Sequence, residues 1–168
     1  MTTVPIFAIQ LILALITMSL LAWWYAAPAL ARLPRESALQ PLLAVHTFRY
    51  IGLVFLASTA VGPSLPQSFA IPAALGTALA GVLALVAIAL LRARSPLGVP
   101  MTWMVSAVGL ADFANAFFQA RANAADVVNN LGAAYYVPIV IVPAALVSHV
   151  MILGLLLRRS GSRSSASA

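Results

Sequence analysis

The chain has 168 residues, of which 63% are hydrophobic and only 7% are charged. Soluble domains are about 45–50% apolar and about 25% charged, so this composition excludes a soluble globular protein. Intrinsic disorder is excluded as well, because its signature is low hydrophobicity. The composition predicts an all-α integral membrane protein, which we expect to form one helical bundle.

The absence of cysteine and the distribution of charge exclude further kinds of site and partner. The chain has no cysteine, which excludes a disulfide framework, a thiolate nucleophile and a Cys-ligated metal. The net charge of +6 comes from nine arginines and three acids. Most of these arginines flank apolar segments, as they do at the cytoplasmic ends of membrane helices. The positive charge therefore indicates membrane topology, and we expect no nucleic-acid partner.

Five apolar runs are each long enough to cross a bilayer, which takes about 20 helical residues. The expected helices span about residues 4–26, 41–61, 70–91, 98–118 and 135–157. Together they form one transmembrane domain over residues 1–159, and the Ser/Ala-rich residues 160–168 are expected to be a disordered tail.

The first run is either a retained helix or a signal peptide cleaved within residues 27–31, which would leave four helices. A retained helix is favoured because no Lys or Arg precedes the run and because it exceeds the about 7–15 residues of a signal core.

Two of the expected helices carry local signals. In the third helix, Ala73, Thr77 and Gly81 recur at four-residue spacing, a small-residue face that permits close helix approach. This face predicts packing, and it is also the candidate surface for a second copy or a membrane partner. In the fifth helix, Pro143 removes a backbone hydrogen bond and predicts a kink.

The arginines predict the orientation of the bundle. Seven lie in the connections that share one side with the C-terminus: Arg32, Arg35, Arg92, Arg94, Arg158, Arg159 and Arg163. Only Arg121 lies on the other side. We therefore expect the N-terminus outside and the C-terminus in the cytoplasm of a bacterial inner membrane.

Ionisable and polar groups inside membrane helices are the default candidates for a functional site, because burying them is costly. The candidates for an intramembrane polar pocket are His46, Arg49, Asp112, Asn115 and His149. At about 1.5 Å per residue, Arg49 and His149 both lie about 12 Å from the cytoplasmic ends of their helices.

Each candidate also has a structural interpretation. Arg49 and Asp112 would form a buried ion pair that selects neighbouring helices. His46 would extend toward the interface, and His149 would make an interhelical hydrogen bond. A further hypothesis makes His46 and His149 the axial ligands of a haem, which needs two imidazoles facing each other across a bundle.

Enzyme signatures are absent from the sequence. It contains no H-E-x-x-H, no G-x-S-x-G, no phosphate-binding glycine loop and no cluster of acids. We therefore predict no catalytic residues, no metal site and a non-enzymatic protein.

Several short motifs between residues 46 and 149 carry a family resemblance. They are Arg49-x-x-Gly52-x-x-Phe55-Leu56, Leu65-Pro66-x-x-Phe69-Ala70-x-Pro72-Ala73, Trp103, Gly109-x-x-Asp112, Val142-Pro143 and His149. In these the chain resembles a group of short uncharacterised bacterial multipass membrane proteins. The resemblance implies the same architecture and a bacterial inner membrane, but no activity. It also implies Gly-Asp where this chain has Gly76-Thr77, so an acid expected in the third helix is missing.

Three functions remain open from the sequence. The first is a small transporter or permeation module using the polar pocket. The second is a haem-binding electron-transfer subunit, and the third is a scaffold or interaction subunit that uses the small-residue face of the third helix.

Overall fold

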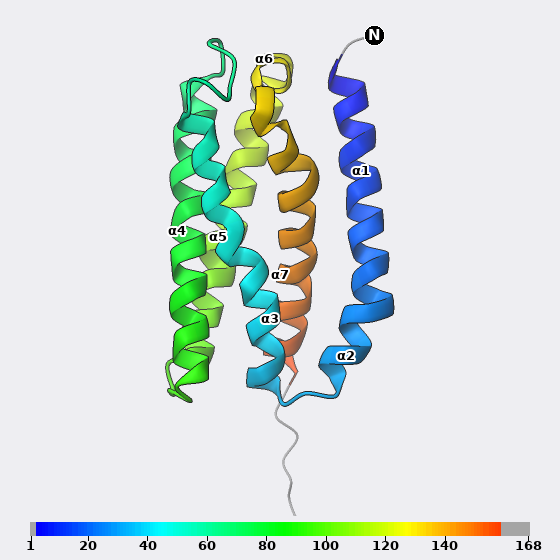
Figure 1. Cartoon of the computed structure of the whole chain (residues 1–168), viewed down its shortest axis with the longest axis vertical. Helices are drawn as coiled ribbons and strands as arrows, with labels where there is room; N and C mark the ends of the chain where they lie inside the picture. The colour runs from blue at the N-terminus through cyan, green and yellow to red at the C-terminus, as the bar shows by residue number, and fades with distance from the viewer. Residues whose placement is uncertain (1–2, 159–168) are drawn as a thin grey trace, which may run out of the picture.

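The computed structural model describes residues 3–158. In this part of the chain there are five long apolar helices, one short helix and no strands. The five long helices run side by side, with successive helices antiparallel (Figure 1). The predicted all-α class and the number of long helices are therefore confirmed. The expected tail of residues 160–168, as well as Arg159 and Arg163, lies outside the described residues.

The first long helix is the least buried element of the bundle. It consists of α1 (Thr3–Leu21), a π-helical turn (Ala22–Ala26) and α2 (Ala27–Ala31). No residue of α1 is buried. Figure 1 shows α1 at the edge of the bundle, next to α7.

The second long helix changes geometry along its length. It begins as α3 (Arg35–Thr47) and continues as a 3₁₀ segment, Phe48–Leu56. The expected range was 41–61. The helix begins earlier because Pro34 precedes it with an extended backbone and Pro41 is accommodated within α3. It ends earlier because Ala57 is extended, with φ −87° and ψ 105°.

The remaining helices are α4 (Gln67–Arg92), α5 (Gly98–Ala122), the short α6 (Ala124–Asn130) and α7 (Val142–Leu157). A 3₁₀ turn (Gly132–Tyr135) and a π-helical turn (Val137–Ile141) precede α7. The π-helical turn lies where the sequence predicts a disturbance, since Pro143 cannot donate a hydrogen bond to the preceding turn.

The interior consists of two apolar clusters separated by polar side chains. Near the end where α2 meets α3, the lower cluster includes Leu39, Leu43, Ala87 and Ile152. The upper cluster, toward α6, includes Phe55, Phe69, Leu131 and Val137. Along the second long helix, and again along α4, buried polar residues lie between the positions of the two clusters. The bundle therefore has a polar layer at mid-height.

The described arginines outside the interior are unevenly distributed. The α2–α3 link, the α4–α5 link and the end of α7 lie at the same end of the bundle (Figure 1). They carry Arg32, Arg35, Arg92, Arg94 and Arg158, whereas Arg121 lies in the last turn of α5, at the opposite end. Arg35 also donates a hydrogen bond to the carbonyl oxygen of Leu156 (2.7 Å), which satisfies a free carbonyl near the C-terminus of α7.

Candidate functional site

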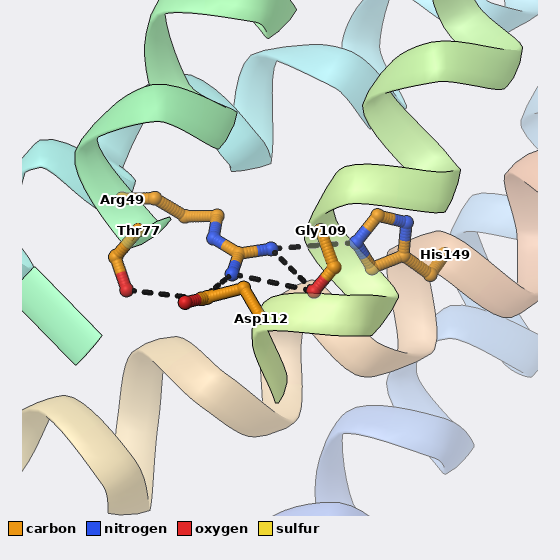
Figure 2. Close-up of polar contacts among 5 residues, drawn as sticks. All are labelled: Arg49, Thr77, Gly109, Asp112 and His149. Carbon is orange, nitrogen blue, oxygen red and sulfur yellow. Dashed lines mark hydrogen bonds and ion pairs between the residues drawn. The ribbon is translucent and has the colours of Figure 1, made fainter. Parts of the chain in front are cut away.

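A buried ion pair joins the second long helix to α5. Arg49 Nη2 lies 2.6 Å from Asp112 Oδ2, and the two side chains are only 1% and 5% exposed. Figure 2 shows the guanidinium extending across to α5. The contact that the sequence suggests between these residues is present. Since a buried charge is strongly unfavourable without a partner, each residue constrains the position of the other.

Further contacts surround this pair. Thr77 Oγ1 donates to Asp112 Oδ2 at 3.2 Å (Figure 2), so α4 also contributes to the site. The carbonyl oxygen of Gly109 lies 3.5 Å from both terminal nitrogens of Arg49, and the guanidinium carbon lies 3.9 Å from the centre of the Phe113 ring. Thr77 thus takes the position in which the resemblance implies an acid, and it bonds the carboxylate instead of adding a second negative charge.

His149 approaches the other side of the guanidinium. Its Nε2 lies 3.4 Å from Arg49 Nη1. Because a guanidinium only donates hydrogen bonds, Nε2 acts as the acceptor and the ring proton lies on Nδ1. His149 therefore connects α7 to the Arg49–Asp112 pair, which agrees with its interpretation as an interhelical hydrogen-bonding group.

The His46 ring packs against the His149 ring, tilted by 44°. Both rings are fully buried, and their centroids are 4.0 Å apart. His46 does not extend to the interface as expected, because its position in α3 faces the interior. Both ring nitrogens of His46 and Nδ1 of His149 lack hydrogen-bond partners among the described residues.

This arrangement does not fit a haem bound by both histidines. Axial ligation places the iron between two imidazole nitrogens, whereas these rings are in direct contact, with His149 Nε2 facing Arg49. Within residues 3–158, no group of three or more His, Asp or Glu side chains is arranged to hold a metal ion.

Glycines provide the space in which the charged groups meet. A Cβ on Gly109 would lie 2.6 Å from His149 Nε2 and 2.8 Å from Arg49 Nη1. A Cβ on Gly76 would collide with the carboxylate of Asp112, and one on Gly52 would lie 2.8 Å from Thr77 Cγ2. The sequence did not predict that Gly76 makes room for Asp112 or that Thr77 bonds it. The small size of these two residues, together with an acid inside a neighbouring expected helix, was a signal that could have indicated both roles.

Asn115 does not join the other candidates. It is exposed on α5, and it makes no side-chain hydrogen bond to the residues that the structure describes. The structure therefore brings together four of the five predicted residues and adds Thr77, Gly109 and Phe113.

The small-residue face of the third predicted helix is used within the chain. Gly81 lies close to the backbone of Thr47 and Tyr50, and Thr77 packs on Gly52. This face of α4 therefore packs against the second long helix within the chain.

A cavity of about 480 Å³ extends from α1 to the ion pair. Its walls come from α1, the second long helix, α4, α5, α6 and the start of α7. Arg49, Thr77 and Asp112 are the only polar residues among its 23 lining residues. His46, His149 and Asn115 do not line it. Its volume is within the range of about 300–1,000 Å³ typical of small-molecule sites.

The chain is an all-α bundle of five helices that are each long and apolar enough to cross a membrane, arranged around a buried polar layer. The chain belongs to the family DUF8737, a domain of unknown function, which matches residues 6–157. No curated protein matches the chain, and no solved structure matches it. A domain of unknown function fits the uncharacterised character that the resemblance implies.

Proposed function

We propose that the chain is a multipass protein of the bacterial cytoplasmic membrane, with its N-terminus outside and its C-terminus in the cytoplasm. The exposed apolar side chains support insertion, because leucines such as Leu79 and Leu85 on α4 are 52% and 57% exposed. The clustering of five described arginines at one end supports the orientation.

This orientation predicts the result of a reporter experiment. A reporter fused after Ala168 is expected to be active in the cytoplasm, and one inserted at Asn129, in the α6 region, outside it. Paired alkaline phosphatase and green fluorescent protein fusions measure both positions. Reporters on the same side of the membrane would contradict five crossings.

We further propose that the protein is a small, non-enzymatic transporter that binds its substrate in the 480 Å³ cavity. The observation that carries this proposal is that the cavity reaches a buried Arg49–Asp112 pair at mid-height of the bundle. Transporter sites commonly lie at this depth, between helices with irregular segments. Here the 3₁₀ segment Phe48–Leu56 and the π-helical turn Val137–Ile141 both contribute to the cavity wall.

The position of the lower apolar cluster supports the proposal that a substrate reaches the cavity from one side of the membrane at a time. It fills the interior between the polar layer and the arginine-rich end, while the cavity lies on the other side of that layer. A transporter needs this asymmetry, because its substrate site must be open to one side while it is closed to the other.

The alternatives receive less support from the observed contacts. The direct contact between the His46 and His149 rings opposes a haem-binding subunit. A scaffold that binds partners through the small-residue face of α4 is opposed by the packing of that face inside the chain.

A photolabelling experiment tests whether the cavity binds small molecules. The probe is 3-trifluoromethyl-3-(m-iodophenyl)diazirine, added to the protein in phosphatidylcholine nanodiscs. We expect more adducts on Leu11 and Phe113, which line the cavity, than on the lipid-facing Leu79 and Leu85. Peptide mass spectrometry measures both sets.

Two variants of α5 provide the comparison. Ala116 lines the cavity, so Ala116→Trp is expected to remove most of the excess labelling of Leu11. Ala107 is exposed on the same helix, and Ala107→Trp is expected to leave it unchanged. Equal labelling of the cavity and the outer surface of α4 in the wild type would refute a binding cavity.

A further inference from the structure

The cavity wall is almost entirely apolar. Of its 23 lining residues, 20 are aliphatic or aromatic, including Phe7, Leu11 and Leu15 from α1. A hydrophilic solute would lose its hydration there without replacement hydrogen bonds. The wall therefore favours a molecule with a large hydrocarbon or aromatic body.

The two charges at the end of the cavity are paired with each other, and of the guanidinium nitrogens only Arg49 Nε has no hydrogen-bond partner among the described residues. Arg49 Nη2 contacts Asp112, and Nη1 is directed at His149 and the Gly109 carbonyl. An anionic ligand would have to displace Asp112 from the guanidinium, and a cationic ligand would have to displace Arg49 from the carboxylate. Because both displacements leave a buried charge without its partner, the site favours an uncharged ligand.

The two oxygen atoms of the Asp112 carboxylate differ in their hydrogen bonds. Both hydrogen bonds to Asp112 reach Oδ2, whereas Oδ1 accepts none from the side chains that the structure describes. The Asp112 side chain is 95% buried and lines the cavity. A carboxylate oxygen is a strong acceptor and stabilises a donor placed against it. Oδ1 itself lies against Gly76, since a Cβ built there would collide with it. The Asp112 carboxylate thus supplies one strong acceptor in the wall of an otherwise apolar cavity.

Helix α1 forms the outer wall of the cavity with few interior contacts. None of its residues is buried. At the end near α6 it is held by polar contacts of Thr3 with Asn129 and of Gln10 with Tyr135, and by the Phe7 ring against Tyr135. A molecule that passes between α1 and the rest of the bundle would come from the surroundings of the bundle, which in a bilayer are lipid chains.

From these observations we propose that the cavity binds an uncharged lipophilic molecule carrying a hydroxyl group, which donates a hydrogen bond to the Asp112 carboxylate and enters from the lipid phase beside α1. This proposal rests on the transporter site proposed above and specifies its substrate class.

Competition against the diazirine probe tests the proposal in the wild-type protein. The four competitors share a dodecyl chain: dodecan-1-ol, dodecyl methyl ether, dodecane-1-sulfonate and dodecyltrimethylammonium. All are compared at equal mole fraction in the nanodisc. Dodecan-1-ol is expected to suppress labelling of Leu11 and Phe113 at about tenfold lower mole fraction than the ether, because only the alcohol donates a hydrogen bond to a charged acceptor.

The sulfonate and the ammonium compound are expected to compete less well than the alcohol. If the sulfonate competed at a lower mole fraction than the other three compounds, Arg49 would bind an anion and the proposal would be overturned. If the ammonium compound competed at the lowest mole fraction, the proposal would be overturned in favour of a cationic ligand. Equal competition by alcohol and ether would exclude the hydrogen bond. In these three cases the cavity still binds a ligand, whereas absence of preferential cavity labelling by the probe itself refutes the proposed function.

Discussion

Replacing Arg49 with leucine is expected to lower the free energy of unfolding by about 3–5 kcal/mol, because it leaves the Asp112 carboxylate buried without its partner. Asp112→Leu is expected to have a similar cost, since it leaves the guanidinium unpaired. The double variant Arg49→Leu, Asp112→Leu contains no buried charge at this position. It is therefore expected to recover much of the lost stability. Reversible unfolding in mixed micelles measures all three variants.

The thermodynamic cycle gives a clear criterion for this pair. If the ion pair acts as the structure indicates, the double variant is more stable than the sum of the single effects predicts. Arg121→Leu provides the control. Arg121 is exposed in the last turn of α5, so its replacement is expected to change stability by no more than about 0.5 kcal/mol. Additive effects of Arg49→Leu and Asp112→Leu would mean that the two residues do not interact.

Adding a single methyl group to Gly109 is expected to destabilise the protein by about 1–3 kcal/mol, the usual cost of overpacking an interior. The new Cβ would lie 2.6 Å from His149 Nε2 and 2.8 Å from Arg49 Nη1, so both groups have to move. The thermal midpoint of Gly109→Ala, compared with wild type in the same detergent, measures the effect.

Gly154 on α7 provides a matched control for this substitution. No atom lies within 4 Å of a Cβ built there, and alanine is preferred over glycine inside a helix by about 0.5–1 kcal/mol. Gly154→Ala is therefore expected to be neutral or slightly stabilising. If His149 is the obstacle, Gly109→Ala should cost less in a His149→Ala background than in wild type. An equal cost in both backgrounds would show that the ring does not limit the space at Gly109.

The two experiments address the same physical feature, a polar layer enclosed by apolar clusters. Its charged groups are held by contacts from four long helices: Arg49 from the second, Thr77 from α4, Asp112 from α5 and His149 from α7. Only α1 contributes no side chain to this network. Helix α1 therefore forms one wall of the cavity without a buried residue of its own, while the other four long helices are joined by the polar network.

Some of the site was predictable from composition alone. Asp112 is the only acid and Arg49 the only arginine well inside the expected helices. Because a buried charge needs a partner, each of the two is the obvious partner of the other. Asn115 shows the limit of this reasoning. It lies three residues after Asp112, which rotates it by about 60° around the helix, enough to move it from the interior to the exposed face of α5. Periodicity identifies neighbouring positions on a helix, but not where the buried face ends.

The sequence by itself determined the all-α class, the five long apolar helices, the uneven distribution of arginines and the set of ionisable residues near mid-height. These properties depend on the residue type and on local spacing. Only the tertiary structure decided that Thr77 bonds Asp112, that Gly76 and Gly109 make room for the charged groups, that His46 packs against His149 and that a cavity reaches the ion pair. Each of these depends on which helix faces lie against each other, and that arrangement results from packing among residues far apart in the chain, which local patterns do not encode.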